Sequence, residues 1–153
     1  MGALAVRRMV SEDAEAVAAL SGVLGHAITT EDVRLRFNVL TSLSDQALFV
    51  AVDSSVVIGW VHAYGVPRLQ TDGYVEIGGL AVSESHRRRG IGARLVRECE
   101  QWGSTAGFSK LRLRSGLHRE GAHLFYQRIG YKQGRASYAF ERALTVEKDE
   151  NAV

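Results

Sequence analysis

A short run of arginines and glycines in the middle of the chain has the residue types and spacing that hold a phosphate group. Arg87, Arg88 and Arg89 stand directly before Gly90-Ile91-Gly92. The glycines leave the first backbone N–H groups of a following helix open, and the helix dipole adds partial positive charge there. The arginines add formal charge at the same place. The turn therefore predicts a pyrophosphate site, and the alternative is a tight turn with a solvated basic patch.

Other ligands fit this turn less well. A dinucleotide fingerprint needs a third glycine where Leu95 stands, and a Walker A loop needs a Gly-Lys pair that the sequence lacks. The whole chain has a formal net charge of only +2, so a small anion is favoured over nucleic acid. The histidines show no metal-ligand spacing, and we expect no metal.

Two titratable side chains could move protons. Glu76 lies on a segment whose apolar content predicts a buried strand, where a carboxylate costs free energy unless it is paired or functional. It is either a general base, a solvated carboxylate, or one bound to a nearby arginine. Tyr126 has a phenol that is protonated at neutral pH, so it is either a general acid or a core aromatic. His62 and Tyr64 alternate along the preceding strand and share one of its faces.

Strands and helices that position these residues follow one another along the chain. Period-two patterns and flanking turn residues predict strands over residues 3–10, 46–52, 56–66, 74–82 and 111–114, with one or two closing strands over 131–144. Caps and apolar residues at intervals of three or four predict helices over residues 11–25, 29–40, 91–107 and 119–128.

Length and composition indicate one globular domain. The chain has 153 residues, of which 46% are hydrophobic and 24% charged. Cys99 is the only cysteine, so no intrachain disulfide can form. No apolar run approaches the roughly 18 residues of a membrane span, and we expect a cytoplasmic protein with no membrane partner. The predicted domain covers residues 1–144, and residues 145–153 form a polar C-terminal tail.

Two motifs of this chain resemble those of one family. Leu80-Ala81-Val82 followed by Arg87-x-x-Gly90-x-Gly92 is similar to the acetyl-CoA signature of the GNAT superfamily of N-acetyltransferases. Residues 122–131 resemble the second motif of that family, and the order of elements matches over nearly the whole chain. The resemblance implies a single-domain α/β fold. Its mixed, mostly antiparallel sheet is splayed at the cofactor strand and has helices on both faces.

The resemblance also implies where acetyl-CoA binds. The strand would open beside a bulge at Gly78-Gly79, so that a pantetheine arm could pair with its backbone. Arg119 stands where many relatives carry asparagine, and it either reaches a phosphate or lies on the exposed side of its helix. The residues expected to bind the cofactor are Leu80, Ala81, Val82, Arg87, Arg88, Arg89, Gly90, Ile91, Gly92, Ala93, Arg119 and Tyr126.

The implied reaction is acetyl transfer to a primary amine of a small molecule. Glu76 resembles the catalytic glutamate of some GNAT enzymes, and Tyr126 matches a tyrosine that lies near the cofactor sulfur in many relatives. A protein or peptide amine is the alternative acceptor. A non-catalytic acyl-CoA-binding module is the alternative of a different class. By analogy with the family we expect a homodimer.

Overall fold

Strands and helices alternate along the chain in the computed structural model, which describes residues 3–22, 25, 27–115 and 119–145. The chain divides into two compact units, residues 1–116 and residues 117–153. The first unit contains the whole sheet. None of the helices in the described ranges is long and apolar enough to cross a membrane.

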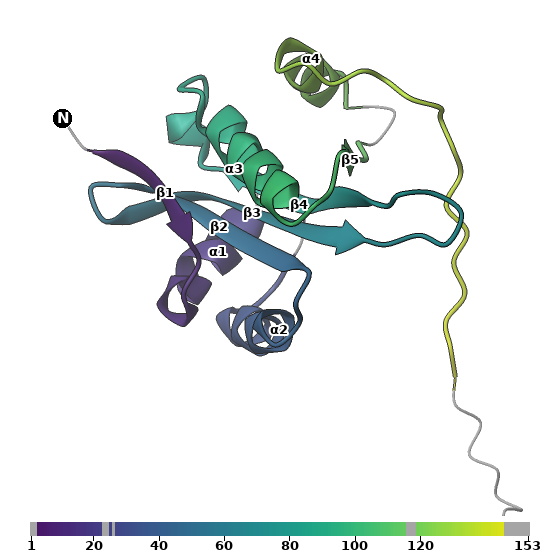
Figure 1. Ribbon diagram of the computed structural model, residues 1–153. Helices are drawn as coiled ribbons and strands as arrows, with labels where there is room; N and C mark the ends of the chain where they lie inside the picture. Colours follow the sequence, from purple (N-terminus) through teal and green to yellow (C-terminus); the bar gives the residue numbers. More distant parts are fainter. Residues whose placement is uncertain (1–2, 23–24, 26, 116–118, 146–153) are drawn as a thin grey trace, which may run out of the picture. The chain divides into compact units, whose positions relative to one another are not determined.

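The sheet of the first unit has five strands, whose order in space follows their order in the sequence (Figure 1). Neighbours from β1 to β4 are antiparallel, and β5 runs parallel to β4. This mixed, mostly antiparallel sheet confirms the predicted fold. The strands are β1 (Leu4–Arg8), β2 (Gln46–Asp53), β3 (Val56–Val66), β4 (Tyr74–Val82) and β5 (Leu111–Leu113).

Helices cover both faces of the sheet, as predicted (Figure 1). α1 (Ala14–Ser21) and α2 (Thr30–Thr41) lie on one face, and α3 (Ile91–Thr105) lies on the other. The predicted start of α2 is confirmed, because Thr29 and Asp32 cap it reciprocally. The Thr29 hydroxyl accepts the Asp32 N–H, and the Asp32 carboxylate accepts the Thr29 N–H, both at 3.0 Å.

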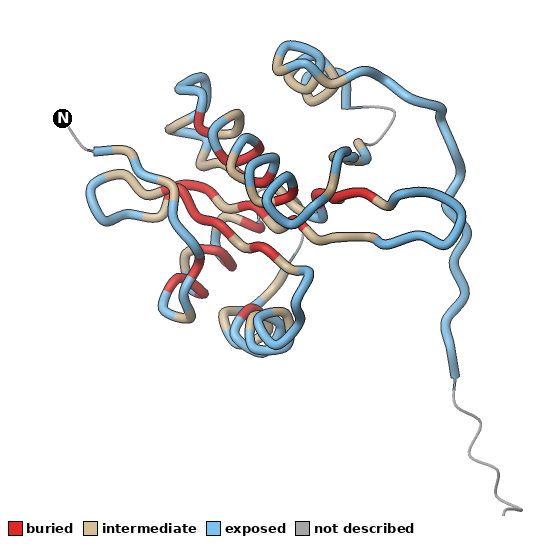
Figure 2. Tube along the Cα trace, in the orientation of Figure 1, coloured by how far each residue is buried: buried red, intermediate tan, exposed pale blue. Residues whose placement is uncertain are grey.

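α3 packs on the sheet through the apolar stripe that its spacing predicts. Ile91, Leu95 and Cys99 are at most 2% exposed, and Figure 2 shows buried positions along this helix and along the central strands. Gly59 of β3 admits the helix closely, because a Cβ there would lie 3.3 Å from Leu95 Cδ1. Burial raises the pKa of the Cys99 thiol to about 12, so this cysteine is an inert part of the core.

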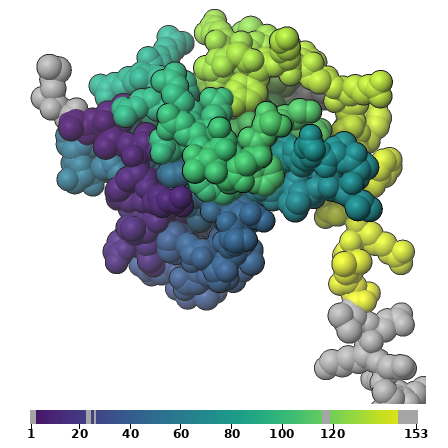
Figure 3. Space-filling view, in the orientation of Figure 1, coloured from purple at the N-terminus to yellow at the C-terminus, as the bar shows by residue number. Residues whose placement is uncertain are grey.

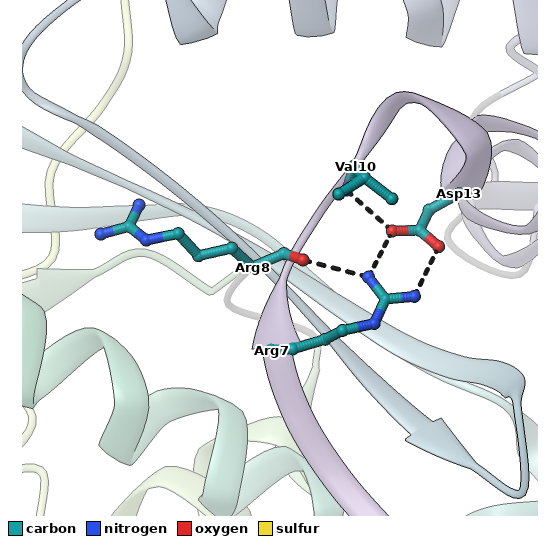
Figure 4. A network of polar contacts seen from close by, with 4 residues as sticks. All are labelled: Arg7, Arg8, Val10 and Asp13. Atoms are coloured by element: carbon teal, nitrogen blue, oxygen red, sulfur yellow. Dashed lines mark hydrogen bonds and ion pairs between the residues drawn. The ribbon is translucent and has the colours of Figure 1, made fainter.

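A partly buried ion pair links the start of α1 to β1 (Figure 4). Arg7 donates two hydrogen bonds to the Asp13 carboxylate, at 2.8 and 2.9 Å, and the Val10 N–H donates a third at 2.9 Å. Asp13 is 5% exposed at the end of a 3₁₀ turn (Ser11–Asp13). Burial alone would raise the pKa of Asp13, but the hydrogen bonds from Arg7 and Val10 outweigh burial and hold that pKa below its usual value.

An extra residue interrupts the pairing of β3 with β4. His62 pairs with Gly79, whereas the next residue, Ala63, pairs with Ile77. Gly78 is therefore the additional residue of a β-bulge, at the glycine pair where the sequence predicts one. A bulge changes the side of the strand to which the following backbone N–H and C=O groups point, and this change determines the geometry of the candidate active site.

The second unit contains α4 (Glu120–Arg128) and the segment that follows it. The prediction of closing strands over residues 131–144 is wrong, because these residues form no strand. A strand needs a ladder of backbone hydrogen bonds to a neighbour, and here alternating apolar side chains stay exposed instead: Tyr138 is 89%, Phe140 94% and Leu144 94% exposed. The predicted polar tail lies outside the described residues beyond Thr145.

Candidate active site

β4 leaves part of its outer edge without a strand partner. It pairs with β5 only over Val75–Ile77, so no strand of the described residues covers the outer edge from Gly78 to Val82. The Val75 N–H points to this outer side, where it donates to the Lys110 carbonyl at 2.9 Å. Directions alternate along a strand, and the bulge advances the alternation by one residue. Leu80 and Val82 therefore turn their N–H and C=O groups outward.

The turn after β4 leads directly into α3. It begins with a 3₁₀ turn (Glu84–His86) and ends at Gly90, the N-cap of α3, which has a φ of +73°. A Cβ on Gly90 would meet no atom within 4 Å, so the glycine is required by its left-handed backbone and not by space. No side chain of the described residues caps α3. The N–H groups of its first turn therefore lack an acceptor within the helix: Ile91, Gly92 and Ala93.

The arginines of this segment have different surroundings. Arg89 lies 3.6 Å from the carboxylate of Asp53, a partner that the sequence did not suggest. Arg94 donates to the Leu4 carbonyl at 3.3 Å, on the side where Figure 3 shows α3 next to β1. Two exposed arginines form no ion pair with any described residue and remain available to an anion: Arg87 and Arg88.

Polar side chains gather beside the bulge on the sheet face that α1 and α2 cover. His62 and Tyr64 share this face, as predicted, with their ring centres 5.3 Å apart. Trp60, two residues earlier on β3, packs against the apolar cluster of α1 and so identifies the face. The His62 Nε2 lies 2.7 Å from Gln46 Oε1 on β2. The sequence analysis missed Gln46, which a correct hairpin register would have placed opposite Tyr64.

Glu76 is the carboxylate of this group. The Tyr64 hydroxyl donates to Glu76 Oε2 at 3.3 Å, and Arg114 Nε lies 3.8 Å from Oε1. The Glu76 side chain is 19% exposed, so the solvated alternative does not apply, and an arginine partner that the sequence analysis had not named is present. The 3.8 Å between Arg114 Nε and Glu76 Oε1 is longer than a hydrogen bond, so Oε1 can accept from another donor. Burial, and then the charge of Glu76, raise the pKa of Tyr64, which therefore stays a neutral donor.

The second unit holds the two remaining candidates. Arg119 is exposed at the start of α4. Tyr126 is half-buried, with its ring edge-on to Phe125 at 5.1 Å and to Tyr131 at 6.4 Å between centres. Burial raises the pKa of Tyr126 and the charge of Arg119 opposes this, so the phenol is protonated at neutral pH. The roles of both residues toward the first unit stay predictions.

Other chemistry finds few candidates in this structure. Within the described residues, no three side chains of His, Cys, Asp or Glu lie close enough together to hold a metal ion. The groups that the first unit does bring together are the outer edge of β4, the uncapped start of α3 and the polar cluster of Gln46, His62, Tyr64 and Glu76. They can offer backbone pairing, an anion site and proton acceptors.

A comparison with protein families identifies the class of this protein. The model of the Acetyltransferase (GNAT) family matches residues 14–131, which is more than half of the chain, and the chain belongs to this family. GNAT enzymes take acetyl-CoA as the acyl donor, and the chain is an acetyl-CoA-dependent N-acetyltransferase. No curated protein sequence matches it significantly.

Solved structures share the fold at low sequence identity. The aminoglycoside N-acetyltransferase AAC(6')-Iy in complex with CoA has a TM-score of 0.82 at 19% identity, over 94% of this chain and 97% of that one. A putative acetyltransferase from Agrobacterium tumefaciens strain C58 has a TM-score of 0.81 at 23% identity, over 90% and 99%. The aminoglycoside 6'-N-acetyltransferase AAC(6')-Ih from Acinetobacter baumannii has 0.80 at 18%, over 94% and 100%. At these identities the likeness concerns the fold.

Proposed function

We propose that the chain transfers the acetyl group directly to the primary amine of a small molecule, with Glu76 as general base and Tyr126 as general acid. The observation that carries this proposal is the outer edge of β4, which is open from the bulge to the turn before α3. A pantetheine arm contains amides that can pair with such an edge as an added strand would. The same edge ends where the uncapped helix begins.

The cofactor residues follow from this edge and turn. The outward groups of Leu80 and Val82 fit the pantetheine, and the uncapped first turn of α3 fits the pyrophosphate. Acetyl-CoA, when bound, supplies an activated acetyl thioester. We assign its binding in the first unit to Leu80, Ala81, Val82, Arg87, Arg88, Arg89, Gly90, Ile91, Gly92 and Ala93, and in the second unit to Arg119 and Tyr126.

Two side chains move the protons in this proposal. Glu76 lies two residues before the bulge, and its carboxylate takes a proton from the amine. The hydroxyl of Tyr64 holds that carboxylate in place from the other strand. Tyr126 keeps its proton at neutral pH and gives it to the departing sulfur. Positioning of the two reactants supplies much of the remaining acceleration.

A small-molecule acceptor is supported by the enzymes whose structures share the fold. Several are aminoglycoside N-acetyltransferases, and one contains a bisubstrate analogue, CoA-S-monomethyl-acetylneamine. We extend this acceptor class, a primary amine on a small molecule, to the present chain. We also propose that residues 1–144 act as one domain in a cytoplasmic homodimer, for which light scattering would give a mass twice that of the chain.

Calorimetric titration with acetyl-CoA tests the cofactor site. We expect binding by the wild type and its loss in Gly92→Glu, because a carboxylate at the start of α3 repels phosphate. Gly22→Glu is the matched control, since Gly22 is exposed, has a φ of −58° and has open space around it. Binding that survives Gly92→Glu, or is absent from the folded wild type, would contradict the assignment.

Thiol release then tests the acceptor class. Sisomicin and spermidine represent small amines, and a lysine-containing peptide represents the alternative acceptor. Thiol release that is faster with either small amine than with the peptide supports the proposal. Thiol release with the peptide but with neither small amine supports protein acetylation. If the protein binds acetyl-CoA but none of these amines causes thiol release, a non-catalytic module is favoured.

Glu76→Gln tests the base. We expect kcat near neutral pH to fall by about 100- to 10,000-fold, since a general base contributes that much, with the affinity for acetyl-CoA unchanged. Glu15→Gln, an exposed glutamate on α1, should leave both quantities unchanged. A pH–rate profile that is the same in wild type and Glu76→Gln would exclude Glu76 as the base.

A further inference from the structure

We propose that His62 binds the acceptor amine: its Nδ1 accepts an N–H hydrogen bond from that amine beside the Gly78 bulge, while Gln46 fixes the ring. This inference rests on the proposed function and adds a residue that distinguishes primary from secondary amines. It starts from the polar cluster described above, in which His62 touches both Gln46 and Tyr64.

Gln46 determines which nitrogen of His62 carries the proton. Its carboxamide oxygen lies 2.7 Å from Nε2, and an oxygen of this kind can only accept. Nε2 must therefore carry hydrogen, which leaves Nδ1 of a neutral ring with a lone pair. The ring is neutral at neutral pH, because burial lowers the pKa of His62.

The free nitrogen points to the bulge. A Cβ built on Gly78 would lie 3.2 Å from His62 Nδ1 and 2.9 Å from Tyr64 Cε1. Both rings therefore occupy space that any side chain at this position would need. Within the described residues no group donates a hydrogen bond to Nδ1. A hydrogen-bond acceptor, His62 Nδ1, thus lies beside the backbone at which the open edge of β4 begins.

Tyr64 joins His62 to Glu76. Its ring lies against the imidazole, and its hydroxyl donates to the carboxylate at 3.3 Å. The cluster therefore offers an amine two acceptors of different character, one negatively charged and one neutral. A neutral primary amine has two N–H groups and satisfies both acceptors: it gives one proton to Glu76, and it keeps the other on its nitrogen while donating that N–H to His62 Nδ1. A secondary amine has only one N–H and leaves one acceptor unpaired.

Two substitutions at His62 distinguish the roles of its two ring nitrogens. The amide of His62→Asn lies where Nδ1 lies and keeps an acceptor there, whereas the amide of His62→Gln lies where Nε2 lies. We expect the KM for n-butylamine to rise about three- to tenfold in His62→Gln, which is the usual value of one hydrogen bond, and less in His62→Asn. The wild type should prefer n-butylamine to N-methylbutylamine, and His62→Gln should lose that preference. The affinity for acetyl-CoA should stay the same in both variants.

A loss in kcat with unchanged KM, or equal behaviour of the two variants, would overturn the inference. Nitrogen-15 NMR of the His62 imidazole tests it without turnover. At fixed pH, we expect a protonated Nε2, an unprotonated Nδ1, and a shift of the Nδ1 resonance when n-butylamine is added. A protonated Nδ1, or a resonance that n-butylamine does not move, would refute it. Absence of thiol release from the wild type would instead refute the proposed function, while the NMR result would still stand.

Discussion

Replacement of Asp13 by alanine should lower the free energy of unfolding by about 2–3 kcal/mol, a value that follows from its hydrogen bonds. Three donor groups of Arg7 and Val10 reach the carboxylate at 2.8–2.9 Å. Each bond to a charged group contributes about 1.5–3 kcal/mol. The Arg7 side chain is 45% exposed and regains water when the partner is lost, so the total is well below the sum.

The assay is urea denaturation followed by circular dichroism, with Asp72→Ala as the control because Asp72 is an exposed loop carboxylate. For a chain of this size, a loss of 2–3 kcal/mol corresponds to a melting temperature lower by about 4–12 °C. The slope of the urea transition should not change, because the surface exposed on unfolding is the same.

The pH dependence of Asp13 gives the sharper result. Its pKa is lower in the folded than in the unfolded protein, so its contribution is complete above the unfolded value of about 3.9 and disappears as pH falls through the folded value. The stability difference between wild type and Asp13→Asn should therefore be constant from about pH 6 to 8 and shrink below about pH 4. A difference as large at pH 3 as at pH 7, or a loss in Asp13→Ala below about 0.5 kcal/mol, would refute the reasoning.

Three further results are expected. Tyr126→Phe should lower kcat with unchanged affinity for acetyl-CoA, and the wild-type rate should lose this acid only at a higher pH than an ordinary tyrosine would, because burial raises the pKa of Tyr126. In urea denaturation Gly79→Ala should destabilise by about 1–3 kcal/mol, since its Cβ would lie 2.5 Å from the Trp60 ring, and Gly90→Ala by about 1–2 kcal/mol through φ alone. Cys99 should react with a thiol reagent only as the protein unfolds, because it is buried with a pKa of about 12.

Features fixed by neighbouring residues in the sequence were predictable. The arginine–glycine turn, the apolar stripe of α3 and the cap at Thr29 depend on residues a few positions apart, and all lie where the sequence analysis expected those elements. The glycine pair also predicted the bulge, because residues without side chains fit where the rings of β3 crowd the next strand.

Features that depend on a distant partner were not predictable. Residues 131–144 have an alternating pattern, but a pattern does not supply the neighbouring strand that a ladder requires. Glu76 was foreseen as a carboxylate on a buried strand, whereas its contact with Arg114 needs the parallel register of β4 and β5. Gln46 gave no signal of its own, because its role arises only when the hairpin register places it near His62.

Gly78 determines which residues of the second half of β4 turn their backbone groups outward. Before the bulge Val75 points its backbone groups outward, and after it Leu80 and Val82 do so, an interval that an uninterrupted strand cannot produce. If Gly78 instead paired regularly with His62, with no bulge, the phase of every later residue would shift. The outward groups of Leu80 and Val82 would then turn toward β3, and their side chains would exchange faces. The enzyme could thus lose its cofactor edge while keeping every residue that forms it.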